Sequence, residues 1–209
     1  MSLPFDPRDA LRHLRRADPT LARVIRRVGP FPAEPPARMS IFAALLVSIV
    51  HQQLSGKAAA TIHGRVVALY GPGGAPRPED LLATSDEDLR RAGLSRGKTL
   101  AVKDLAAKCA SGIVPSMAHL RRMPDELVIE RLTAVRGVGR WTAEMVLMFR
   151  LVRPDVLPID DLGIRKGFQR VYGRRQLPTP FAVARYGERW RPYRTVASWY
   201  LWRSLESPP

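Results

Sequence analysis

Apolar residues recur at the spacing of an α-helix along nearly the whole chain, and few segments alternate in the manner of a half-buried β-strand. Linkers rich in Pro and Gly, such as GPFPAEPPAR and GPGGAPRP, interrupt this pattern. The chain is therefore predicted to be all-α. Helices are expected at residues 6–16, 56–70, 85–91, 98–110, 124–133, 141–151, 162–172, 181–190 and 195–204, with two more beginning after Asp18-Pro19 and after Ser40.

Two Pro-rich breaks, near residues 30–38 and at Pro154, suggest how these helices are grouped. Residues 41–153 are expected to form a bundle of about six helices. Residues 1–40 and 154–209 are expected to form a second helical unit from the two ends of the chain. Two helical subdomains would then flank an active-site cleft, because ligand sites are common at such junctions.

The charge balance points to a polyanionic partner. The 209 residues include 34 Lys and Arg against 19 Asp and Glu, which gives a net charge of +15, while 45% hydrophobic residues are enough for a core. No apolar run approaches the roughly 18 residues that span a bilayer. Nucleic acid is therefore favoured over a membrane. The N-terminal sequence does not resemble a secretory signal, so a cytoplasmic, nucleoid-associated protein is expected.

Cysteine and histidine usage argues against a metal or redox cofactor. Cys109 is the only cysteine, which excludes an internal disulfide, a zinc site built from cysteines and a four-cysteine iron–sulfur cluster. The four histidines, His13, His51, His63 and His119, show no metal-ligand spacing. No cofactor is expected from these residues.

The segment LTAVRGVGRWTA predicts a helix, a tight turn and a second helix, with Gly137 and Gly139 in the turn. Glycine permits positive φ and lets a phosphate approach the main-chain amides. A compact turn with no ligand is the commoner explanation of two such glycines. Arg136 and Arg140 frame them and Thr142 can cap the second helix, which favours a phosphate clamp that does not read sequence.

An acidic pair follows in the segment LPIDDLGIRK, where Asp161 lies 161 − 139 = 22 positions after Gly139. Taken alone, Asp160 or Asp161 is most simply the N-cap of a helix that begins near Leu162. A catalytic carboxylate is the alternative, and adjacent residues can fill both roles.

Together, the hairpin, the spacing and the acidic pair resemble the helix–hairpin–helix (HhH-GPD) DNA glycosylase superfamily, and within it the bacterial 3-methyladenine DNA glycosylase II group. The resemblance runs from Ser40 to about Trp202 and includes IVHQQLS, AGLSRGKTLAVKDLA and YGERWRPYR. It implies a DNA glycosylase of base excision repair that flips alkylated bases out of DNA and leaves an abasic site. The chain resembles a short form without the N-terminal β-containing domain of the enteric relative.

The resemblance also implies roles for individual residues. Asp161 matches the catalytic carboxylate, with Asp160 as the fallback. Trp141 stands where members with lyase activity have a lysine, and an indole cannot form a Schiff base, so activity on abasic sites is not expected. Trp202 matches an aromatic of the base pocket, although it can equally pack the last helix. Met145 replaces an aromatic of the relatives.

Gln52 and Gln53 occupy the place where the family inserts a wedge into the DNA, and Gln53 aligns with the inserted residue. A polar helix end in contact with solvent is an equally good explanation for Gln52. Relatives also bind a monovalent cation through hairpin carbonyls, which here would belong to Thr133, Val135 and Val138.

The implied partner is double-stranded DNA with damaged bases, bound by a monomer. Two other functions remain open. A non-enzymatic helix–hairpin–helix DNA-binding protein would leave the acidic pair, Trp141 and the glutamines unexplained as a set. A glycosylase with lyase activity on oxidised bases is disfavoured by Trp141 and by the missing cluster cysteines.

Overall fold

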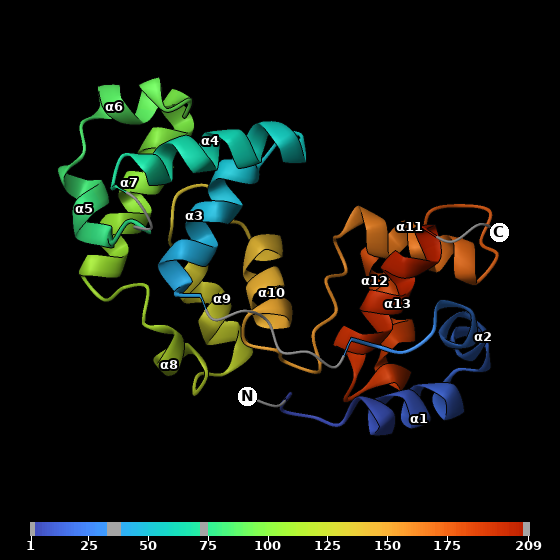
Figure 1. The fold of residues 1–209 in the computed structure, drawn as a ribbon. Helices are drawn as coiled ribbons and strands as arrows, with labels where there is room; N and C mark the ends of the chain where they lie inside the picture. Colours follow the sequence, from blue (N-terminus) through green and yellow to red (C-terminus); the bar gives the residue numbers. More distant parts are fainter. Residues whose placement is uncertain (1–2, 33–38, 72–74, 207–209) are drawn as a thin grey trace. The chain divides into compact units, whose positions relative to one another are not determined.

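The computed structural model of the protein describes residues 3–32, 39–71 and 75–206, and within these ranges it contains helices and no strand (Figure 1). The prediction of an all-α fold is confirmed. No helix in the described ranges is long and apolar enough to cross a membrane. In chain order the elements are α1 (Pro7–Ala17), α2 (Pro19–Val28), α3 (Ile41–His51), α4 (Gly56–Ala68), α5 (Pro78–Ala83), α6 (Asp86–Arg91), α7 (Arg96–Ala110), α8 (Met117–Leu120), α9 (Asp125–Thr133), α10 (Arg140–Phe149), α11 (Leu162–Val171), α12 (Pro180–Gly187), the 3-10 turn η1 (Glu188–Trp190) and α13 (Arg194–Glu206).

Side-chain caps explain where many of these helices begin. Ser40 accepts a hydrogen bond from the Ala43 amide at 3.1 Å and so starts α3, as expected from the sequence. Ser55, Ser85, Ser95, Ser116 and Thr179 cap α4, α6, α7, α8 and α12 in the same way. Two short helices, α5 and α8, were not predicted: α5 begins at Pro78, the last residue of the predicted linker GPGGAPRP, and the four residues of α8 are too few to show helical periodicity.

The chain forms two compact units, and each is described separately. Unit 1 comprises Met1–Ala37 and Leu147–Pro209, and unit 2 comprises Arg38–Val146. The second boundary falls inside α10, whereas the sequence suggested a boundary between residues 153 and 154.

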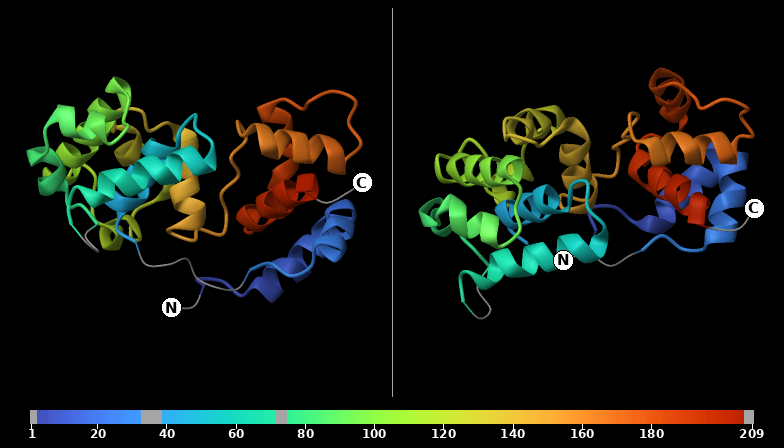
Figure 2. Two further views of the ribbon diagram at one scale, coloured as in Figure 1. Left: turned by 45° about the horizontal axis from the view of Figure 1, so that its top comes forward. Right: turned by 90° about the horizontal axis from the view of Figure 1, so that it is seen from above.

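Unit 2 is organised around α7. This helix packs against α3, α5 and α6, and α4 packs against α3 (Figure 2). Leu45 and Ile49 from α3 and Val102 and Leu105 from α7 are fully buried. Because α3 is apolar on most of its surface, it lies in the core and its polar C-terminus carries the two glutamines to the edge of the unit.

Unit 1 is organised around α13, which packs against α11, α2 and α1. Gly167 of α11 lies against the main chain of α13, and a Cβ at this position would overlap the carbonyl group of Leu201. The two helix backbones therefore approach more closely than any other residue at position 167 would allow. This contact sets the register between the helix that follows Asp161 and the helix that carries Trp202.

A buried carboxylate connects the two ends of the chain within unit 1. Asp18 is 1% exposed and caps α2 by accepting hydrogen bonds from the Thr20 and Leu21 amides at 3.1 and 3.0 Å. Its other oxygen accepts from the Tyr172 hydroxyl at 2.6 Å and from Trp190 Nε1 at 2.9 Å. Burial and the neighbouring carboxylate both raise the pKa of Tyr172, so that hydroxyl remains a donor at neutral pH. Four donors thus stabilise the buried charge.

Candidate active site

Asp161 is the N-cap of α11, and two donors hold its side chain. Its Oδ1 accepts a hydrogen bond from the Ile164 amide at 2.7 Å and another from the indole Nε1 of Trp202 at 2.9 Å. The carboxylate is therefore fixed by its own helix and by α13. Asp160, by contrast, is exposed to solvent in the preceding turn. Of the acidic pair, Asp161 is therefore both the N-cap of α11 and the carboxylate that the structure holds in place.

Two glycines on α11 allow Trp202 to reach this carboxylate. A Cβ on Gly163 would lie 2.9 Å from both Cδ1 and Nε1 of the indole, which is closer than real Cβ atoms approach. Gly167 lies one turn later on the same face and allows the close approach to α13. The motif DLGIRKG therefore supplies the carboxylate and also the space in which its partner lies.

Phe149, the last residue of α10, was not singled out from the sequence. Its ring centroid lies 6.0 Å from that of Trp202 with an angle of 32° between the planes, and the side chain is 44% exposed. Offset aromatic contacts at this distance are favourable. The sequence did offer one indication of this position, because Phe149 lies four residues after Met145 and therefore shares a face of the helix with that predicted pocket residue. Trp202, which donates to Asp161, is therefore in contact with a second aromatic ring, that of Phe149.

The segment that leads to Asp161 is fastened to α13. The hydroxyl of Thr195 donates to the Arg153 carbonyl at 2.6 Å and accepts from the Val156 amide at 3.0 Å. Asp155 forms an ion pair with Arg194, whose Nε lies 2.7 Å from Oδ1. Because α13 also carries Trp202, one helix positions both the carboxylate and the chain that precedes it.

In unit 2, the predicted turn between α9 and α10 is present. Gly137 has φ of +78°, a conformation that favours glycine, whereas Gly139 is not in that region. The Val138 amide donates to the Val135 carbonyl at 3.0 Å and closes the turn. The Arg136 amide donates to Asp104 Oδ2 at 2.7 Å, which ties the turn to α7.

Lys108 adds a second attachment on the same helix. Its ammonium group lies 2.7 Å from Asp104 Oδ2 and also donates to the Ala134 carbonyl. Burial alone would raise the pKa of Asp104, but the hydrogen bonds from the Arg136 amide and Lys108 outweigh it, so the net shift of the pKa is downward. Of the carbonyls predicted to bind a cation, that of Val135 accepts a hydrogen bond from the Val138 amide, and Lys108 donates to the neighbouring Ala134 carbonyl.

The basic and polar residues predicted to line the hairpin differ in their surroundings. Arg140 donates to both oxygens of Glu126, at 3.0 and 2.6 Å, and to Glu144 at 3.2 Å, so much of its charge is compensated within unit 2. Thr142 does not cap α10, contrary to the expectation, because the helix begins two residues earlier at Arg140 and leaves Thr142 buried inside it.

Trp141 and Met145 lie four residues apart on α10, so they share one face of the helix. The Trp141 side chain is 48% exposed and Met145 is partly buried. No lysine stands at either position.

The two glutamines after α3 have different environments. Gln52 donates from Nε2 to the Gly137 carbonyl at 2.8 Å, so it links the end of α3 to the hairpin. Lys98 donates to the main-chain carbonyls of Val50 and Gln52 at 2.6 and 2.9 Å and closes the helix C-terminus. Gln53 is exposed and has φ of +56°, which is strained for a residue with a Cβ.

Within the part of the chain that the structure describes, no three His, Cys, Asp or Glu side chains gather as a metal site would require.

The residues at positions 46–192 match the model of the HhH-GPD superfamily of base excision DNA repair proteins, and the chain belongs to this superfamily. It is 36% identical over 193 residues to DNA-3-methyladenine glycosylase 1 of Schizosaccharomyces pombe, which covers 92% of this chain and 85% of the relative.

Two solved structures are similar to the whole fold. A 3-methyladenine DNA glycosylase of S. pombe in complex with abasic DNA has a TM-score of 0.84 and 35% identity, covering 95% of this chain and 97% of the other. A DNA-3-methyladenine glycosidase of Bacillus halodurans has a TM-score of 0.86 and 36% identity, covering 98% and 92%.

Proposed function

We propose that the protein is a DNA glycosylase that removes alkylated purines, with 3-methyladenine and 7-methylguanine as the leading substrates, and leaves an abasic site in duplex DNA. The superfamily and the names of the relatives at 35–36% identity support this function. The observation that carries it is the Asp161 carboxylate, held by the Ile164 amide and the Trp202 indole. A carboxylate fixed in this way needs no reorganisation when positive charge develops beside it.

The reaction breaks the bond between C1′ of the deoxyribose and the purine nitrogen, and the electron pair of that bond leaves with the base. An alkylated purine that carries a positive charge departs as a neutral molecule. The Asp161 carboxylate stabilises the positive charge that develops on the sugar. A water oxygen then bonds to C1′ and its proton passes to the carboxylate or to solvent. Trp202 acts as a positioning residue through its hydrogen bond, and its ring and that of Phe149 offer surfaces for an electron-poor base.

We further propose that the enzyme is monofunctional, because Trp141 stands where lyase members of the superfamily have a lysine. An indole nitrogen cannot attack C1′ to form a Schiff base. The strand would therefore stay intact after base release, and other enzymes would process the abasic site.

The hairpin and the glutamines are proposed to bind the DNA. Main-chain groups around Gly137 and Gly139 would contact phosphates without reading sequence, with Arg136 and Arg140 beside them. Gln53, exposed and strained at the end of α3, would enter the gap left by the flipped base, while Gln52 fixes that turn to the hairpin. Thr142 would contribute through the packing of α10, since it is buried.

Carbonyls of Thr133, Val135 and Val138 are proposed to bind a monovalent cation, which would neutralise partial negative charge where the hairpin meets phosphate. The net charge of +15 supports DNA as the partner. The protein is proposed to act as a cytoplasmic monomer on nucleoid DNA.

The test is release of free bases from methylated duplex DNA, measured by chromatography for the wild type and for Asp161→Asn and Asp160→Asn. We expect Asp161→Asn to lower the single-turnover rate by at least about a hundredfold with DNA affinity within a few-fold of wild type. The matched Asp160→Asn variant should stay close to wild type. Normal turnover by Asp161→Asn would exclude Asp161 as the catalytic residue.

The same samples test the monofunctional assignment, because gel electrophoresis without alkaline treatment should show unbroken strands. A nicked product from the pure enzyme would contradict it. If neither wild type nor variant released a base although both bound DNA, a non-enzymatic hairpin protein would be the better description.

A further inference from the structure

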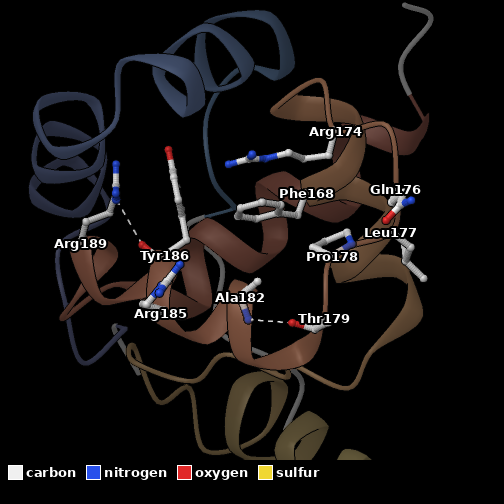
Figure 3. A pocket seen from close by; sticks show the side chains of 10 residues that line it. All are labelled: Phe168, Arg174, Gln176, Leu177, Pro178, Thr179, Ala182, Arg185, Tyr186 and Arg189. Atoms are coloured by element: carbon white, nitrogen blue, oxygen red, sulfur yellow. Dashed lines mark hydrogen bonds between the residues drawn. The ribbon is translucent and has the colours of Figure 1, made fainter.

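Unit 1 contains a cavity of about 510 Å³ between α11, α12 and the segment that joins them (Figure 3). Its volume lies in the range of about 300–1,000 Å³ that small-molecule sites occupy. Asp161 lies at the N-terminus of α11, whereas the cavity begins at Phe168 and continues past the other end of that helix. Phe168 lies 168 − 161 = 7 positions after Asp161, which is roughly 10 Å along the helix axis, so the cavity is a separate site. We call it the arginine pocket.

Aromatic rings form one wall of the arginine pocket and are held rigidly. Of the rings, Phe168 and Tyr186 line the pocket, with centroids 5.0 Å apart and planes at 87°; Phe168 is 3% exposed and Tyr186 is partly buried. Tyr172 does not line the pocket, but its tilted ring contacts both, at 4.4 and 4.7 Å. Tyr172 and Trp190 in turn donate to buried Asp18. Leu177 and Pro178 complete the apolar lining. The surface available to a flat group is therefore Tyr186 together with the exposed Arg189 guanidinium that stacks on it, while the buried Phe168 supports Tyr186.

Three arginines, Arg174, Arg185 and Arg189, supply the charge of the pocket. All three are exposed, and among the described residues none of them forms an ion pair with a carboxylate. Arg189 stacks on Tyr186, with Cζ 3.7 Å from the ring centroid. Figure 3 shows Arg174 extending past the Phe168 ring towards Tyr186. The four donors to the nearby buried Asp18 are neutral, so they stabilise its charge without cancelling it, but three guanidinium groups against this one carboxylate still leave an excess of positive charge.

The joining segment is fixed in place before any ligand binds. Arg165 Nε donates to the Pro178 carbonyl at 2.8 Å, and Gln169 donates to the Arg175 carbonyl at 3.2 Å. The Arg174 amide donates to the Gln169 carbonyl at 2.9 Å. Side chains of α11 thus hold the main chain on both sides of the pocket, which lowers the entropic cost of binding.

From this geometry we infer that the arginine pocket binds a nucleotide, with its phosphate against the guanidinium groups and its base against the aromatic wall. Guanidinium groups suit phosphate because they donate paired hydrogen bonds, and purine or pyrimidine rings stack on aromatic or guanidinium planes. An inorganic anion would leave the apolar wall facing water. An uncharged base would leave three cations without a partner. A nucleotide supplies both a phosphate for the guanidinium groups and a base for the aromatic wall.

The nucleotide has two possible sources, a free nucleotide or the phosphorylated end of a DNA strand. The first experiment is calorimetric titration of the full chain with 2′-deoxyadenosine 5′-monophosphate, 2′-deoxyadenosine and inorganic phosphate. Wild type is compared with Arg174→Gln, Arg189→Gln and the control Arg175→Gln, a neighbouring exposed arginine that does not line the pocket.

We expect the monophosphate to bind more tightly than either part alone, and each pocket variant to weaken its binding at least about tenfold, because charge-assisted hydrogen bonds are lost. Arg175→Gln should bind like wild type. No binding of the monophosphate, equally tight binding of phosphate alone, or an equal loss in Arg175→Gln would each overturn the inference.

A second titration, with short single strands that carry or lack a 5′-phosphate, identifies the source. If the strand end is the ligand, the phosphorylated strand binds wild type more tightly than the strand without the phosphate, and Arg174→Gln removes the advantage. If the free nucleotide is the ligand, the two strands bind alike. Asp161→Asn should keep nucleotide binding in either case, so failure of the proposed glycosylase activity and failure of this inference are separate results.

Discussion

The carboxylate in unit 1 and the hairpin in unit 2 are both held by hydrogen bonds that include groups distant in sequence, but in opposite ways. At Asp161 the proposed functional group is a side chain, and an amide of α11 and the indole of Trp202 fix it. At the hairpin the proposed functional group is the main chain, and the side chains of Asp104, Lys108 and Gln52 fix it. A catalytic side chain needs a defined direction, whereas a phosphate clamp needs a defined backbone path.

Among the variants that leave Asp161 itself unchanged, the largest effect is expected from Trp202→Phe, which keeps the aromatic ring and removes the donor to Asp161. A hydrogen bond to a charged group is worth about 1.5–3 kcal/mol, so the single-turnover rate of base release should fall about 10–100-fold. DNA affinity should not change. Trp199→Phe, on the same helix and without that contact, is the control and should stay within about twofold of wild type. An unchanged rate in Trp202→Phe would remove the indole from the description of how Asp161 is positioned.

The hairpin can be tested with Gly137→Ala, which introduces a Cβ at φ of +78°. We expect the free energy of unfolding to fall by roughly 1–2 kcal/mol, measured by urea denaturation. Gly139→Ala is the matched control, since a Cβ there meets open space and its φ is not positive. If both variants lost the same free energy of unfolding, the positive φ at Gly137 would not be what makes a glycine necessary there.

Variants of Gln53 can separate the backbone strain at this position from its proposed role as the wedge that enters the DNA. Gln53→Gly should raise the free energy of unfolding by roughly 1 kcal/mol, because glycine adopts φ of +56° without strain. Gln53→Ala keeps the strain. Both variants lose the side chain, so both should lower base release if the glutamine is the wedge. Normal base release by either variant would argue that Gln53 does not enter the DNA.

The smallest effect is expected from the pH dependence at Asp104. Because its folded-state pKa is lowered from 3.8, its ionised form stabilises the folded protein above that pH, and this contribution disappears as the pH falls through the lower value. The difference in unfolding free energy between wild type and Asp104→Asn should thus be constant from neutral pH to about pH 5 and shrink below pH 4. A difference that grew in acid would contradict the direction of the shift.

Local chemistry made most of the fold predictable, since serine and aspartate caps mark helix starts wherever a periodic segment follows. Ser40 and Asp18 are clear examples. The prediction failed where periodicity was absent, as in α5 and α8, and where the helix began earlier than its apparent cap at Thr142.

The sequence was enough to name residues of the candidate site, but it did not predict which of them contact one another. The motif around Asp161 is local, but Trp202 lies 41 positions away and Gln52 lies 85 positions from Gly137. Nothing in the local sequence states that Arg140 pairs with Glu126 or that Gly163 leaves room for an indole. Such contacts depend on how the helices cross, which single-residue patterns do not encode.

The buried carboxylate of Asp18 has a consequence for the order of events during synthesis. Its partners Tyr172 and Trp190 leave the ribosome only after more than 150 further residues have been added, since the hydrogen bonds span 154 and 172 positions. Unit 2 is one continuous stretch and can complete its core in that interval, whereas α1 and α2 wait with an apolar face uncovered. We therefore expect unit 2 to fold first in the nascent chain, with α1 and α2 completing their packing only after α11 and α13 have been made.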